Sequence, residues 1–189
     1  MTKRRRKKQA HPVFNINWND VRVQRIGAIS LVFLASYLFV AFTSYIFTWQ
    51  IDQDKVQGFS FATLFAGDFA TANWLGRLGA IVSNAFFYWG VGLSSFVIPV
   101  LMAYYGLRKL APTKLTHQPN LAGYLVIGGL VTSVFLEFVF SGSAFAWGGA
   151  VGSEVCAWLY SFVGGAGLMI FFAFIAAAAV VWFRNPEWH

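Results

Sequence analysis

Side chains that could do chemistry are few in this chain and are widely separated. The sequence has seven Asp and Glu, three histidines and one cysteine among 189 residues. His11, His117 and His189 are too scattered to indicate a metal site, and Cys156 has no second cysteine for a disulfide. None of the lysines follows the glycine-rich turn of a phosphate-binding loop. The sequence therefore predicts no catalytic residue, cofactor or metal, and we interpret Cys156 as a buried small hydrophobe.

Glu137 is the one acid that falls inside a long apolar region, near the outer end of an expected helix. An ionisable group costs free energy inside a bilayer and needs a partner or a function there. We favour an interfacial, hydrated or hydrogen-bonded carboxyl group, and a proton or ion site is the alternative. Glu154 stands at the outer start of the next expected helix, where the helix dipole favours an acid.

The elements that carry these residues are four stretches without Asp, Glu, Lys or Arg, at residues 26–51, 78–107, 115–136 and 155–183. About 20 helical residues cross a hydrocarbon core of roughly 30 Å, so each stretch is long enough to span a membrane. The composition agrees, with 58% hydrophobic and 11% charged residues. The sequence predicts an all-α membrane protein with four transmembrane helices, at about 26–48, 78–107, 121–140 and 155–183.

The distribution of basic residues predicts the orientation. Eight of the fourteen basic residues precede the first helix, three lie in the second connection and one follows the fourth helix. Because cytoplasmic loops are enriched in Lys and Arg, we expect both termini in the cytoplasm. The expected domains are a basic cytoplasmic arm (1–20), a transmembrane domain (21–184) and the start of a linker or tail (185–189).

The arm contains a run of six cations, which we expect to contact anionic lipid, and nucleic acid is the alternative partner. These residues are Lys3, Arg4, Arg5, Arg6, Lys7 and Lys8.

Small residues within the helices are candidates for close helix packing, because lipid provides no hydrophobic drive between helices. We favour packing within one bundle, and a face for self-association is the alternative. Pro99 is expected to kink the second helix. The packing candidates are Gly76, Gly79, Ala80, Gly90, Ser94, Gly148, Gly149, Gly152, Gly164 and Gly167.

Three segments together resemble one known family. Residues 73–80 (Asn-Trp-Leu-Gly-Arg-Leu-Gly-Ala), continuing through Phe87, Gly90, Pro99 and Gly106, are similar to the second transmembrane helix of bacterial FtsK/SpoIIIE-type DNA translocases. Residues 148–152 (Gly-Gly-Ala-Val-Gly), followed by Leu159, Gly164 and Gly167, resemble the start of their fourth helix. Residues 47–54 are also similar to some members, and the resemblance spans about residues 25–183.

This resemblance implies a membrane anchor that positions a DNA-translocating motor at the division septum of the bacterial inner membrane, in cell division and chromosome segregation. The implied partners are the lipid bilayer, membrane proteins of the division machinery and further copies of the chain. In the family a linker and an ATP-binding motor follow the fourth helix. We therefore expect the sequence to continue beyond His189 into an ATP-dependent translocase that contacts DNA only through that motor. A stand-alone relative is the alternative.

Two other functions stay open at this stage. A small transporter or channel-like protein would place Glu137 in a hydrated cavity. A membrane protein of the envelope or division machinery without a motor would share the four-helix topology.

Overall fold

The computed structural model describes residues 18–56, 70–111 and 118–184. The regular elements in these ranges are all helical, and four helical segments are long and apolar enough to cross a membrane. The all-α, four-span prediction is therefore confirmed. The basic run Lys3 to Lys8 and the expected tail 185–189 lie outside the described residues.

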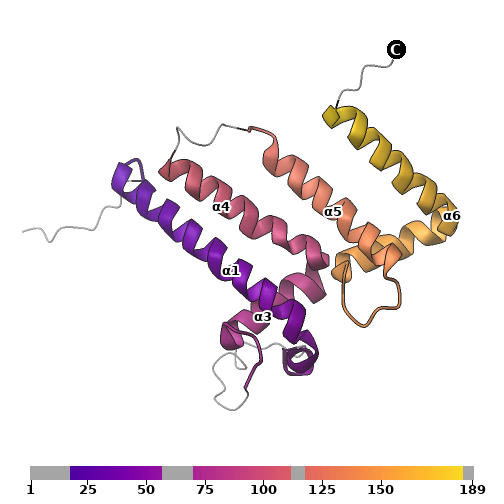
Figure 1. Ribbon diagram of the computed structural model, residues 1–189, viewed down its shortest axis with the longest axis horizontal. Helices are drawn as coiled ribbons and strands as arrows, with labels where there is room; N and C mark the ends of the chain where they lie inside the picture. Colours follow the sequence, from indigo (N-terminus) through magenta and orange to yellow (C-terminus); the bar gives the residue numbers. More distant parts are fainter. Residues whose placement is uncertain (1–17, 57–69, 112–117, 185–189) are drawn as a thin grey trace, which may run out of the picture.

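The first helix, α1, spans Val21–Val56 and extends further at both ends than the predicted 26–48. Its 36 residues correspond to about 54 Å, so it is longer than a bilayer core. The extra turns at its C-terminal end carry Asp52, Asp54 and Lys55. The N-terminal part of α1 lies beside α4, which spans Val97–Leu110, and its C-terminal part lies by α3, which spans Gly76–Phe86 (Figure 1).

The second span is interrupted rather than continuous. It consists of α3 (Gly76–Phe86), a π-helical turn η1 (Phe87–Val91), a 3-10 turn η2 (Gly92–Phe96) and α4. Gly90 has non-helical dihedral angles and Gly92 a φ of 61°. The interruption precedes Pro99, where a kink was predicted, and Pro99 is the third residue of α4. α4 continues directly from η2, and the Val97 N–H donates to carbonyl oxygens of that 3-10 turn.

The third span, α5 (Leu121–Val139), matches its predicted range closely, whereas α6 (Gly149–Arg184) begins earlier than predicted and is broken at Gly164 (φ 70°, ψ 174°). Figure 1 shows the two halves of α6 meeting at a sharp angle. The second half runs antiparallel to α5, with ring contacts of Tyr124 to Phe183 and Phe135 to Phe172. Its length from residue 165 to 184 corresponds to about 30 Å, enough for one crossing.

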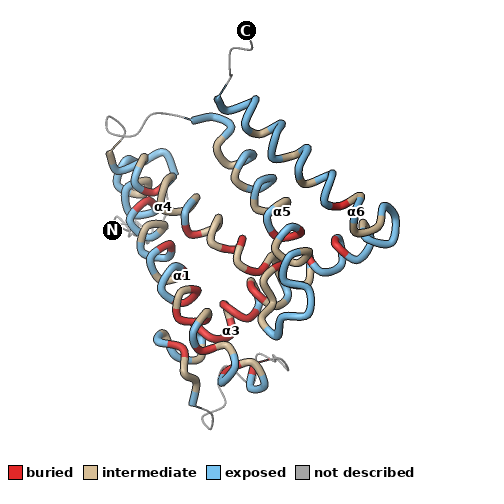
Figure 2. The backbone as a smooth tube through the Cα atoms, turned by 45° about the vertical axis from the view of Figure 1, so that its right-hand side comes forward, coloured by how far each residue is buried: buried red, intermediate tan, exposed pale blue. Residues whose placement is uncertain are grey.

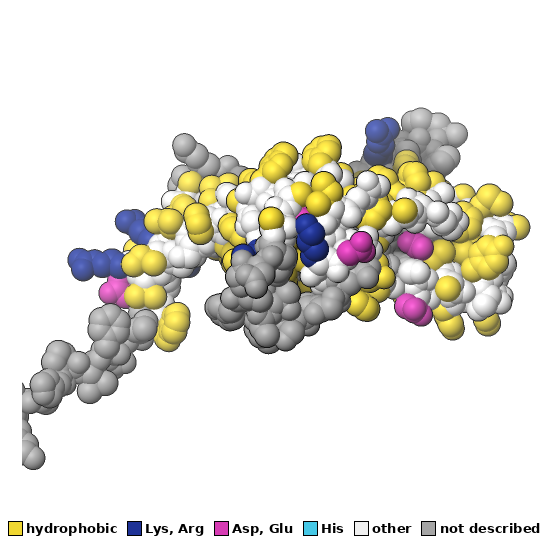
Figure 3. Space-filling view, turned by 90° about the horizontal axis from the view of Figure 1, so that it is seen from below, with side chains coloured by type: hydrophobic (Ala, Val, Ile, Leu, Met, Phe, Trp, Pro, Cys, Tyr) yellow, Lys and Arg dark blue, Asp and Glu magenta, His cyan; other side chains and the backbone are white. Residues whose placement is uncertain are grey.

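Burial is concentrated where α1, α3 and the interrupted turns meet (Figure 2). The largest buried cluster comprises Leu38, Ala41, Phe42, Tyr45 and Phe87. Large apolar side chains remain exposed elsewhere, and Figure 3 shows hydrophobic atoms spread over the surface of the molecule. In water such a surface would be unfavourable, but in a bilayer it is what lipid chains cover.

Most of the basic residues in the described ranges gather at one end of the molecule. The start of α1, the end of α4, the start of α5 and the end of α6 lie at one end, and α3 lies at the other (Figure 1). The first end carries Arg22, Arg25, Arg108, Lys109 and Arg184. We call it the basic end. The opposite end, where the C-termini of α1 and α5 carry Asp52, Asp54 and Glu137 beside Lys55, we call the acidic end.

Candidate functional site

Three segments that are far apart in the sequence meet where the second span is interrupted. The Leu93 N–H donates to the Trp147 carbonyl at 2.9 Å, which joins η2 to the turn before α6. The Ser133 hydroxyl of α5 donates to the Gly148 carbonyl at 2.6 Å. Backbone groups that are unpaired within a helix interruption thus find partners on neighbouring segments, as burial in a membrane requires. We call this region the glycine junction.

Glycine is required at this junction because main chains touch there. Gly149 has a φ of 63°, and a Cβ on it would overlap the carbonyl oxygens of Phe87 and Gly90. A Cβ on Gly92 would overlap the Trp147 carbonyl. Backbone atoms cannot rotate away as a side chain can, so these contacts exclude any larger residue.

The junction also includes small residues that face α5. A Cβ on Gly148 or Gly152 would lie within 2.7 Å of the Ser133 carbonyl oxygen. Ser94 is buried and lies near Gly129 of α5. Of the predicted packing residues, the structure thus gathers Gly90, Ser94, Gly148, Gly149 and Gly152 in one region. Sequence reasoning missed Gly92 and Ser133, although both are small residues in apolar surroundings.

The other predicted packing residues have different surroundings. Gly79 permits the close approach of Asn73, and Ala80 is buried with Val56 and Ile81. Gly76 has a φ of 65°, and no atom lies within 4 Å of an added Cβ. Only its backbone conformation therefore favours glycine. Gly164 likewise faces open space, and a Cβ on Gly167 would meet only Val163, which lies just before the break in α6. Neither of these two packs against another helix among the described residues.

A second cluster, at the acidic end, fixes the chain that enters α3. Asp52 is fully buried, and its two carboxyl oxygens accept from the N–H groups of Ala72 (2.7 Å) and Asn73 (2.9 Å). The Ser44 hydroxyl oxygen accepts from the next N–H, that of Trp74, at 2.9 Å. Three consecutive backbone donors are therefore satisfied by side chains of α1. We call this arrangement the Asp52 clamp.

The side chain of Asn73 completes the clamp. Its amide nitrogen donates to the Ala41 carbonyl at 3.1 Å, and its oxygen accepts from the Leu75 N–H at 3.0 Å. One turn further along α1 from Ala41, the Tyr45 hydroxyl donates to the Asn84 side-chain oxygen of α3 at 3.0 Å. The sequence contained a signal that was missed: Ser44, Thr48 and Asp52 recur every four residues, which puts them on one helix face.

Glu137 lies near the end of α5 beside Gly148 and is half-buried. It lines two open hollows of about 320 and 460 Å³ at the acidic end. Cys156 is buried against Val134 and Leu168, as expected of a small hydrophobe. His11, His117 and His189 lie outside the described residues.

These features define a class of protein. Interrupted helices are joined through main-chain contacts, and polar side chains form hydrogen bonds with backbone groups. Large apolar side chains remain exposed on the outer surface of the helices. This is a multi-pass helical membrane domain.

The family follows from comparison of the sequence. Residues 21–189 match the family described as the 4TM region of DNA translocase FtsK/SpoIIIE, and the chain belongs to that family. It is thus the membrane region of a translocase of this type, a family that belongs to bacterial cell division. Comparisons with curated protein sequences and with solved structures gave no significant match.

Proposed function

We propose that this chain anchors a DNA-translocating motor in the bacterial inner membrane and positions it at the division septum. The match of residues 21–189 to the membrane region of FtsK/SpoIIIE translocases carries this proposal. It favours an anchor over a small transporter and over an envelope protein without a motor. In this proposal force generation and ATP hydrolysis belong to a motor region outside this chain, so the chain alone hydrolyses no ATP.

The orientation that the proposal needs has both termini in the cytoplasm, where a motor would meet DNA. Twelve of the fourteen basic residues precede α1 or lie in its first turns, lie at the end of α4 or in the α4–α5 connection, or end α6. The described members of this set are at the basic end, at the start of α1 and the ends of α4 and α6. The positive-inside rule supports placing that end in the cytoplasm.

The localisation of the isolated chain tests the positioning role. A fluorescent protein is fused to the chain and expressed at low level in a dividing rod-shaped bacterium. We expect enrichment at midcell during constriction, whereas a four-pass inner-membrane protein of unrelated function labels the envelope uniformly. Uniform envelope fluorescence from a fusion that is monodisperse by size-exclusion chromatography would overturn the positioning proposal.

A further inference from the structure

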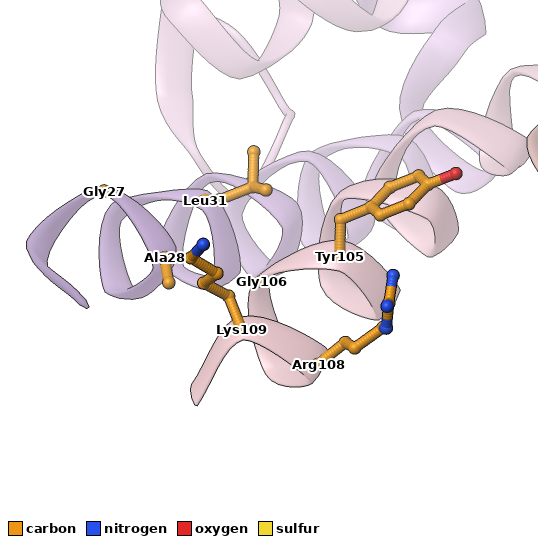
Figure 4. Close-up of a pocket in the computed structure, with 7 residues that line it drawn as sticks. All are labelled: Gly27, Ala28, Leu31, Tyr105, Gly106, Arg108 and Lys109. Atoms are coloured by element: carbon orange, nitrogen blue, oxygen red, sulfur yellow. The ribbon is translucent and has the colours of Figure 1, made fainter. Parts of the chain in front are cut away.

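A groove of about 640 Å³ lies between the beginning of α1 and the end of α4 (Figure 4). From α1 it is lined by Gly27, Ala28 and Leu31. The two helices touch at its base, because a Cβ on Gly106 would come within 3.0 Å of the Ala28 carbonyl oxygen. Gly27 has no side chain and no atom within 4 Å of an added Cβ, so it leaves the floor of the groove open.

The α4 wall of the groove is polar and basic. Tyr105, Arg108 and Lys109 line it, and Figure 4 shows Lys109 reaching towards Ala28 while the Arg108 guanidinium lies on the Tyr105 side. Neither side chain forms a hydrogen bond or ion pair with another residue in the described ranges. Two cations at the mouth of one groove are therefore available to an anionic ligand.

The depth of the groove matches the boundary between lipid chains and headgroups. The first charge-free stretch begins at residue 26, next to Gly27, and the second ends at residue 107, next to Arg108. The same boundary therefore crosses both helices at the groove. An occupant would meet apolar surface on the membrane side and positive charge on the water side.

We propose that this groove binds one anionic phospholipid, with the phosphate at Arg108 and Lys109 and an acyl chain along Gly27 and Leu31. Basic pockets between transmembrane helices suit anionic headgroups, and a free phosphate would leave the apolar floor uncovered. The assignment goes beyond anchoring: it names a specific lipid partner. Its place in the inner leaflet rests on the proposed orientation, but binding in detergent does not.

The test is a titration of the purified chain in dodecyl maltoside micelles with dioleoyl phosphatidylglycerol, with retained lipids counted by native mass spectrometry. The variant Arg108→Gln/Lys109→Gln should lower the apparent affinity at least tenfold, since each basic residue near a headgroup contributes about fivefold. The control Arg184→Gln removes a cation at the same end but outside the groove, and it should change the affinity less than twofold.

A second pair of variants tests the floor. Gly27→Leu should fill the groove and abolish the tightest binding event, while Gly123→Leu should not. Both glycines are exposed, helical and free of atoms within 4 Å of an added Cβ. This pair keeps the proposal testable even if the double charge variant fails to fold.

The proposal fails if Arg184→Gln weakens binding as much as the double variant, which would indicate diffuse attraction. It also fails if Gly27→Leu binds normally, if dioleoyl phosphatidylcholine binds as well as the anionic lipid, or if inorganic phosphate displaces it. Septal localisation of the tagged chain is a separate measurement. A loss of lipid binding and a loss of positioning are therefore distinguishable.

Discussion

At the scale of single residues, the glycine junction is the most demanding point in the molecule. Gly149→Ala should destabilise the protein by about 2 kcal/mol or more, because a left-handed conformation and overlap with three main-chain atoms act together. Thermal unfolding in detergent, followed by tryptophan fluorescence, measures the effect.

The control is Gly128→Ala on α5, where no atom lies within 4 Å of an added Cβ. Alanine favours helix by about 1 kcal/mol over glycine, so this variant should be neutral or more stable. Equal unfolding temperatures for Gly149→Ala and Gly128→Ala would contradict the role assigned to the junction.

The Asp52 clamp makes a separate prediction. Asp52→Asn keeps the size of the side chain but turns one of its two acceptors into a donor that faces a backbone N–H. Leaving a buried donor unpaired costs about 1–3 kcal/mol, so we expect a loss in that range. Asp54→Asn, an exposed neighbour on the same helix, should have little effect. Circular dichroism during titration with sodium dodecyl sulfate compares the two, and equal stability would count against the clamp.

At the scale of elements, the broken helix α6 is the feature that can be tested most directly. Spin labels at Ser153 and Ala176, with Cys156→Ala in the background, report the distance across the break. A straight helix would separate these positions by about 35 Å, so the bent helix should give a clearly shorter distance. A value near that of a straight helix would contradict the bend.

The glycine at the break has a prediction of its own. A Cβ on Gly164 meets no atom within 4 Å, so Gly164→Ala acts through backbone conformation alone. We expect a loss of about 1–3 kcal/mol, because this combination of φ and ψ is nearly restricted to glycine, and a shift of the Ser153–Ala176 distance to longer values. Gly123→Ala, at an open helical position, is the matched control for thermal unfolding.

These elements show what the sequence could and could not predict. The length of the four stretches without charged residues indicated all four spans. The free energy gained by burying about twenty apolar residues in lipid outweighs the local conformational preferences of single residues. The length did not indicate the breaks at Gly90–Gly92 and Gly164, since glycine is common in membrane helices both for packing and for bending. Proline was the stronger local signal for a kink, so Pro99 drew the predicted bend to a position after the observed interruption.

At the scale of the whole molecule, the candidate site was only partly predictable. Small residues marked the junction, but which of them meet depends on the two breaks, which bring the turn before α6 against η1 and η2. The Asp52 clamp was not predicted, because the first helix was expected to end at about residue 48 and Asp52 therefore fell outside it. The groove at the basic end depends on the pairing of α1 with α4, and spacing within one helix carries no information about that pairing.

The gathering of basic residues at one end leads to a prediction of topology. Single cysteines at Ala111, after α4, and at Ser143, before α6, are placed in the Cys156→Ala background. An impermeant maleimide should label Ser143 in intact cells and should leave Ala111 unlabelled until the membrane is permeabilised, because the basic end is retained in the cytoplasm. Labelling of both sites after permeabilisation is the control for reactivity. Labelling of the cysteine at position 111 but not of the one at position 143 in intact cells would show that the orientation is the reverse of the one proposed. A motor attached after α6 would then lie on the side of the membrane without DNA.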